Sequence, residues 1–146
     1  MEMVQRVRKT DLARNTRQVI RDVLRGKTAV VESHGQPEVA IVDVTDYYLQ
    51  RAALAYFTQP PEVSQERGLS DQEVEQAETE QDRYNLVLAY YLGEVISLGR
   101  AAELLELSWL DLRLRLARLG IPMRLGPQSK EEILVEIEAM KKWEQP

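Results

Sequence analysis

Two hydrophobic periods alternate along the first 58 residues, so this part of the chain must combine strands with helices. Residues 3–8 alternate apolar and polar side chains, which predicts a short edge strand. Residues 11–25 carry apolar side chains mostly at helical spacing, after the N-cap candidates Thr10 and Asp11 and before Gly26. This pattern predicts one helix over residues 11–25.

Two runs rich in β-formers follow, at residues 28–32 and 38–44. They flank residues 33–37, whose Gly and Pro suit a hairpin turn. Residues 46–56 then return to a helical pattern, which makes the predicted order βαββα with a three-stranded sheet. A unit of roughly 55 residues is marginal alone, so we expect it to gain stability from dimerisation.

Charge is distributed unevenly along the chain. Residues 1–27 contain eight bases and three acids, a sum of +5, whereas the whole chain has a formal charge of −5. Arg14, Arg17, Arg21 and Arg25 recur at three- or four-residue intervals, so they form one basic stripe on the predicted helix. Such a local excess is typical of a nucleic-acid-binding surface, although a solvated amphipathic helix would also carry it.

The first 58 residues resemble the N-terminal domain of the Phd/YefM antitoxins. The residues that carry the resemblance are Lys9 to Arg14, the hairpin Val30 to Pro37, the strand Val39 to Val42, and Asp46-Tyr47-Tyr48. The resemblance implies a homodimer, or a higher homo-oligomer, that binds its own operator and neutralises a toxin with a more C-terminal segment. Arg14 matches the position of a family DNA contact. Ser33 stands where the family often has an arginine, which leaves His34 as a weaker substitute.

The candidate DNA-binding residues follow from this charge pattern and this resemblance. They are Arg6, Arg8, Lys9, Arg14, Arg17 and His34. A two-fold dimer would double this basic surface so that it spans successive half-sites of double-stranded DNA.

Composition changes after Phe57. Residues 59–69 contain three turn formers and few apolar residues, which predicts a linker between a domain at 1–58 and a helical domain at 70–146. From Ser70 the chain is acid-rich, and Ser70 with Glu73 forms a capping box at the start of a predicted helix that continues to Leu92. Its carboxylates suit a solvated face, a metal or acid–base site, or contact with a basic partner.

Short helices follow in the second half. Ser97 precedes a helix over residues 98–105, and a turn leads to another helix over residues 109–119, which is a helix-turn-helix-like arrangement. Alternation over residues 110–116 also fits a strand, but Leu and Arg favour helix. Residues 84–140 resemble a family of small prokaryotic antitoxin-like proteins through Ile96 to Leu104 and Gly120-Ile121-Pro122. That group often accompanies PIN-domain ribonuclease toxins.

Two roles remain open for this region. Arginines on the 109–119 helix would suit a DNA reader, but the net charge of residues 97–124 is only +2, which favours an interaction module. The final predicted helix, residues 130–143, has an apolar stripe. The candidate partner-binding residues on it are Leu134, Ile137, Met140 and Trp143.

Several classes of protein are disfavoured. The chain has no Cys and one His, so disulfides, thiolate metal sites and most nucleophile–base pairs are absent from the sequence, and we expect neither a cofactor nor enzymatic activity. No signal peptide or membrane-length apolar run is present, so the expected location is the cytoplasm. The sequence therefore predicts a two-domain α+β antitoxin that represses its own operon and binds a PIN-domain, RelE-like or Doc-like toxin. The alternative is a stand-alone transcriptional regulator with two DNA-binding surfaces and no toxin.

Overall fold

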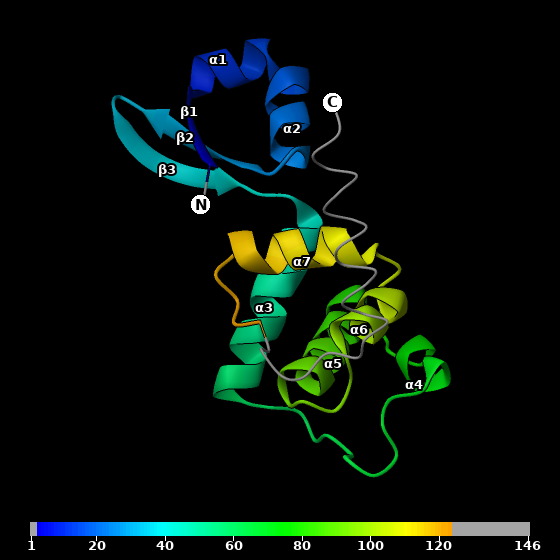
Figure 1. Cartoon of the computed structure of the whole chain (residues 1–146). Helices are drawn as coiled ribbons and strands as arrows, with labels where there is room; N and C mark the ends of the chain where they lie inside the picture. Colours follow the sequence, from blue (N-terminus) through cyan, green and yellow to red (C-terminus); the bar gives the residue numbers. More distant parts are fainter. Residues whose placement is uncertain (1–2, 124–146) are drawn as a thin grey trace. The chain divides into compact units, whose positions relative to one another are not determined.

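Among the described residues, strands occur only between residues 3 and 41, where two short helices separate the first strand from the second, and the later elements are all helices. This gives the protein an α+β fold and confirms the expected fold class (Figure 1). The computed structural model describes residues 3–123. Backbone contacts divide the chain into two compact units, residues 1–47 and 48–146, and each is described by itself. The predicted functional boundaries at residues 58 and 69 stay a prediction.

The first unit contains a mixed three-stranded sheet. Strand β1 (Met3–Arg8) pairs in parallel with β2 (Lys27–Ser33), which pairs antiparallel with β3 (Gln36–Ile41). The parallel pair needs a crossover, and helices α1 (Lys9–Arg14) and α2 (Thr16–Leu24) supply it.

A small hydrophobic core holds the two helices to the sheet. Val19 and Val23 of α2 pack with Val7 of β1 and Ala29 of β2, and Leu12 lies partly buried beside them. Because this cluster has only four buried members within residues 3–47, the unit has little apolar burial to stabilise it alone. The expectation that this unit gains stability from dimerisation stays a prediction.

The predicted continuous helix over residues 11–25 is wrong, because the helix is interrupted at Asn15. This residue has φ −122° and ψ 34°, caps α1 and precedes α2. The Thr16 hydroxyl donates a 2.7 Å hydrogen bond to the Leu12 carbonyl. Asn and Thr side chains compete for backbone groups, which favours a helix end at such a pair.

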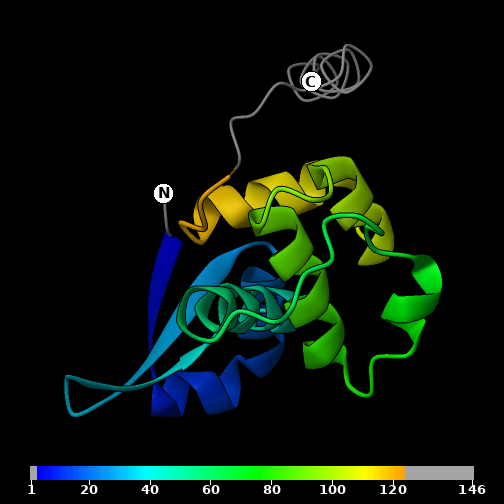
Figure 2. The same cartoon turned by 90° about the horizontal axis from the view of Figure 1, so that it is seen from below.

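The β2–β3 hairpin was predicted correctly, but the predicted second strand over residues 38–44 was placed too late. Strand β3 spans Gln36–Ile41, and Val44 already begins the next helix. His34 and Gly35 have φ values of 52° and 75°, the two left-handed conformations that a type I′ turn needs. Figures 1 and 2 show this turn extending past the end of α1.

Helix α3 (Val44–Thr58) is capped by the buried Asp43, whose Oδ1 accepts hydrogen bonds from the backbone N–H of Thr45 (2.8 Å) and Asp46 (3.2 Å). The predicted span of 46–56 lies inside this helix. The division between the compact units falls within α3, at Tyr47 and Tyr48.

In the described part of the second unit, up to residue 123, four further helices each begin after a Ser or Thr. They are α4 (Asp71–Glu75), α5 (Glu80–Leu92), α6 (Leu98–Leu104) and α7 (Trp109–Arg118). In every case the hydroxyl accepts a hydrogen bond from the backbone N–H three residues later, at 3.0–3.2 Å. The caps are Ser70, Thr79, Ser97 and Ser108. The predicted continuous helix from Ser70 is wrong, because Thr79 starts a new helix after α4 ends.

The core of the second unit is much larger than that of the first. The largest of its fully buried side chains are Leu49, Leu88, Leu105, Leu112 and Leu116. Leu112 and Leu116 lie on α7, so residues 110–116 are helical and the strand alternative is excluded.

The segment predicted as a linker packs on this core. Leu69 is buried within it and Val63 lies partly buried against it. The backbone N–H of Ser64 donates a 3.0 Å hydrogen bond to the Tyr90 hydroxyl. Within residues 59–69 no helix or strand is present, but at least part of the segment is fixed to the helical unit.

Candidate functional site

Six of the eight basic side chains of residues 1–27 fall into two groups, and those of the first group each face a carboxylate. Arg6 pairs with Glu32 at 3.1 Å, and Arg8 pairs with Asp11 at 3.1 Å. Lys9 pairs with Glu38 at 2.8 Å. The hydrogen bond from Lys9 lowers the pKa of the Glu38 carboxyl below its usual value. We call Arg6, Arg8 and Lys9 the paired cations.

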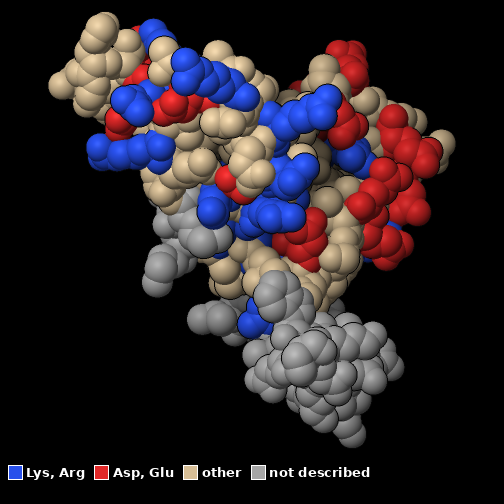
Figure 3. Space-filling model, turned by 90° about the horizontal axis from the view of Figure 1, so that it is seen from above, with Lys and Arg blue, Asp and Glu red and all other residues tan. Residues whose placement is uncertain are grey.

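The second group surrounds the junction of α1 and α2. Arg14, Arg17 and Arg21 line a depression with a volume of about 360 Å³, together with Ala13, Asn15, Thr16 and Gln18. All three arginines are exposed, and none has an ion pair with a carboxylate of residues 3–123. We call Arg14, Arg17 and Arg21 the junction arginines. Figure 3 shows Lys and Arg side chains gathered on the face that α1 and α2 present.

Helix α2 brings two of these arginines together because its other face is committed to the core. Val19 and Val23 point into the sheet, so Arg17 and Arg21, spaced i and i+4, share the outward side. The single acid of α2, Asp22, accepts a 3.0 Å hydrogen bond from the Gln18 side chain. Like charges at this spacing destabilise a helix by about 0.2–0.5 kcal/mol, so an anion would relieve a repulsion that the fold leaves in place.

The structure thus brings together two of the sequence-predicted DNA-binding residues, Arg14 and Arg17, and adds Arg21. The spacing of the basic stripe was the signal for Arg21. His34 is exposed at the hairpin turn and does not line the depression.

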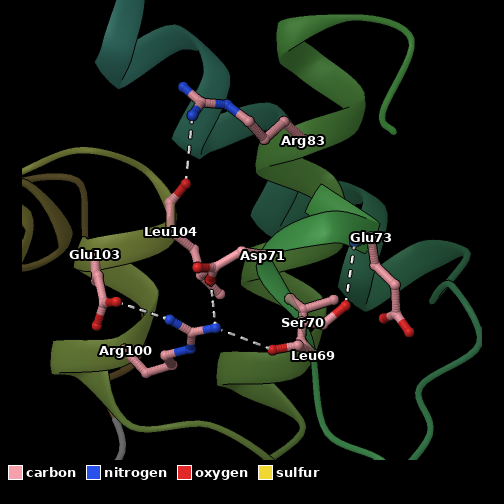
Figure 4. Close-up of polar contacts among 8 residues, drawn as sticks. All are labelled: Leu69, Ser70, Asp71, Glu73, Arg83, Arg100, Glu103 and Leu104. Atoms are coloured by element: carbon pink, nitrogen blue, oxygen red, sulfur yellow. Dashed lines mark hydrogen bonds and ion pairs between the residues drawn. The ribbon is translucent and has the colours of Figure 1, made fainter. Parts of the chain in front are cut away.

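In the second unit the acid-rich segment is partly neutralised by two arginines (Figure 4). The Arg100 guanidinium contacts Asp71 Oδ1 at 2.6 Å and Glu103 Oε1 at 2.9 Å, and it donates to the Leu69 carbonyl at 3.4 Å. Arg100 therefore ties α6 to the start of α4 and to the packed connecting segment.

Arg83 makes a similar link between α5 and the end of α6. It pairs with Glu80 at 2.8 Å and donates to the Leu104 carbonyl at 3.3 Å. Glu106 lies 3.8 Å away, in the turn that follows α6. Arg83 lines a hollow of about 330 Å³ whose rim carries carboxylates. Within residues 3–123 no group of three or more metal-ligating side chains could hold a metal ion.

Helix α7 follows α6 after a short turn, which confirms the predicted helix-turn-helix-like arrangement of these two helices. Arg115 pairs with Asp111 at 3.1 Å, and the Arg113 guanidinium lies 5.5 Å from the centre of the Trp109 ring. Leu114 is 41% exposed, opposite the buried Leu112 and Leu116. The outward side of α7 therefore presents an apolar residue at its centre.

The remaining candidate residues, Leu134, Ile137, Met140 and Trp143, lie outside the described residues, as does the whole predicted final helix over residues 130–143. Between residues 3 and 123, every helix is too short or too polar to span a bilayer.

The structural class of the chain is therefore clear: a βαββ unit with a basic helical face, followed through α3 by a helical unit that contains a helix-turn-helix. The model of the uncharacterised protein family UPF0175 matches residues 62–142, more than half of the chain, and the chain belongs to this family. The match includes the Ile96 to Leu104 motif and reaches back into the packed connecting segment. No curated protein and no solved structure was found to match the chain.

Proposed function

We propose that the protein is the antitoxin of a type II toxin–antitoxin module, which represses its own operon through the first unit and binds a toxin through the helical unit and the segment after it. The observation that carries the proposal is the set of junction arginines, which are exposed and meet no carboxylate of residues 3–123, on a chain whose net charge is −5. The resemblance of residues 1–58 to the Phd/YefM antitoxins adds the expected role.

The basic face supports operator binding on physical grounds. Arg side chains that contact DNA phosphates release condensed counterions, and this supplies a large, salt-dependent share of the affinity. The small core of the first unit favours a homodimer, since a second copy would bury more apolar surface. Val4 and Val39, 54% and 58% exposed on the edge strands β1 and β3, offer such surface. Two copies would present two basic faces to one operator.

Features of the helical unit support the proposal that it binds a protein. Leu114 at the centre of the outward side of α7 suits an apolar contact better than a groove of DNA, and two of the α7 arginines have partners on the same helix. Toxin neutralisation would be steric, because a helix that covers the active surface of a ribonuclease needs no chemistry of its own. Sequence places an apolar stripe for such a contact at Leu134, Ile137 and Met140.

The test is co-expression of the full chain with its neighbouring reading frame. We expect the two proteins to purify as one complex, the neighbour alone to arrest growth, and the chain to restore it. A fluorescently labelled duplex from upstream of the gene should bind the chain, with an affinity that falls steeply as salt rises.

The outcomes separate the candidates. Operator binding without any complex or growth rescue would favour the stand-alone regulator. Failure to bind either the upstream duplex or the neighbouring protein would overturn both.

A further inference from the structure

The paired cations and the junction arginines differ in one respect that sequence cannot show. The paired cations already form ion pairs with carboxylates of the same chain, and the junction arginines form none with residues 3–123. Arg6, Arg8 and Lys9 each lie within 3.1 Å of a carboxylate oxygen. The junction arginines converge on one depression in which none of them meets an acid of residues 3–123. We infer that this depression is a phosphodiester-binding site, and that the junction arginines rather than the paired cations carry the phosphate affinity. The inference rests on the proposed DNA-binding function.

A phosphodiester suits the depression in charge, size and hydrogen-bonding groups. Its lining contains three guanidiniums and no Asp or Glu. A volume of about 360 Å³ is enough for a phosphate group with part of its sugars. Guanidiniums bind phosphate oxygens through parallel N–H donors, and the bond is strengthened by the charge on both partners.

The backbone at the same place adds a smaller contribution. Asn15, which precedes α2, makes no side-chain cap, so the backbone N–H groups of the first turn of α2 donate no hydrogen bond to its side chain. Thr16, Arg17 and Gln18 form that turn and also line the depression. The positive end of the helix dipole therefore points toward the same anion as the arginines.

The paired cations are poorer phosphate contacts because a phosphate must first displace a carboxylate. The Lys9–Glu38 pair is close enough to lower the pKa of Glu38. Arg6 and Arg8 lie 3.1 Å from carboxylate oxygens of Glu32 and Asp11. Displacement would leave an unpaired carboxylate next to the DNA backbone, which repels it.

The decisive experiment compares two triple variants with equal net charge. Arg14→Ala/Arg17→Ala/Arg21→Ala removes the junction arginines, and Arg6→Ala/Arg8→Ala/Lys9→Ala removes the paired cations. We expect the first variant to lose at least about a hundredfold in duplex affinity at moderate salt, and its log–log salt slope to fall by about 2.7 for each bound protomer. The second variant should lose less than about tenfold, with a slope change below about 1.

Long-range electrostatics alone makes the opposite prediction. The second variant exposes three carboxylates, so a purely non-specific attraction would weaken at least as much there as in the first variant. Equal losses, or a larger loss in the second variant, would overturn the inference. Circular dichroism of both variants checks that the sheet and helices are retained. If the junction variant is unfolded, the single substitutions Arg17→Ala and Arg8→Ala give the same comparison.

A binding measurement on the full wild-type chain locates the anion and identifies its source. Backbone amide resonances of residues 13–18 are followed by NMR during titration with inorganic phosphate and, separately, with the upstream duplex. Shifts with both ligands, or with the duplex alone, support the inference, and the second result makes DNA the source. Duplex binding without shifts at residues 13–18 overturns it. Shifts with inorganic phosphate in a chain that binds no duplex would refute the DNA-binding function while the anion site stands.

Discussion

Leu116 and Leu114 lie two positions apart on α7 and differ almost only in burial. Leu116 is 0% exposed and Leu114 is 41% exposed. Truncation of a fully buried Leu costs the transfer free energy of the lost methyl groups plus the free energy of the cavity, together about 2–5 kcal/mol. For Leu116→Ala we expect a loss of about 3 kcal/mol in the free energy of unfolding. Leu114→Ala should lose less than about 1 kcal/mol, since its side chain gains little from folding.

Urea denaturation followed by tryptophan fluorescence provides the assay. Trp109 packs against the core of the second unit, and Trp143→Phe removes the other tryptophan. With a denaturant dependence of about 1.5 kcal/mol per molar urea, Leu116→Ala lowers the midpoint by about 2 M and Leu114→Ala by less than about 0.7 M. Equal shifts in the two variants would refute the packing of α7 described above. They would also remove the support that the exposed Leu114 gives to a protein partner.

Three further predictions concern single residues whose roles the structure defines. Ser97→Ala removes the cap of α6 and should cost about 1 kcal/mol in the same assay, whereas Ser97→Thr should keep most of the stability. Gly120 has φ 70° with open space around it, so Gly120→Ala should cost about 1 kcal/mol through backbone strain alone, and an unchanged midpoint would contradict that conformation. The Glu38 carboxyl, followed by NMR as pH is lowered, should titrate below its usual value of 4.5, and Lys9→Met should raise it. Because the pKa of folded Glu38 is lowered, its pair with Lys9 stabilises the fold above the unfolded pKa, and this contribution is lost as pH falls through the folded pKa.

Local rules predicted much of the fold. Alternation identified β1, the Gly35 turn identified the hairpin, and the hydroxyl caps Ser70 and Ser97 identified helix starts that the structure confirms. These signals act over a few residues, so they can be read without knowledge of the tertiary contacts.

The two helix breaks were not predicted, because both predictions gave more weight to the overall helical spacing of apolar residues than to single polar side chains that compete for backbone hydrogen bonds. Asn15 and Thr79 each interrupt a pattern that continues on both sides. At the second break the Thr79 hydroxyl caps α5, and at the first break the hydroxyl of Thr16 bonds to the Leu12 carbonyl. The packing of residues 59–69 was missed for a different reason. Val63 and Leu69 are isolated apolar residues in a polar stretch, and only the tertiary fold shows that the core accepts them.

The candidate DNA-binding residues show the same limit. Net charge and spacing placed six residues near one surface, but the carboxylates that pair with Arg6, Arg8 and Lys9 come from β2, α1 and β3. Two of those partners are distant in sequence, at Glu32 and Glu38. Spacing along one helix therefore finds cations, while only the fold tells which of them are available to a ligand.

The nine residues from Ile96 to Leu104 hold the frame of the helical unit together: Ser97 starts α6, Arg100 ties it to α4, and Ala101 and Ala102 let it pack closely. All of these contacts are made within the helical unit itself. A related protein could keep this motif and still carry different residues on the outward side of α7. Relatives that share the motif would therefore share the fold of the helical unit without having to bind the same partner.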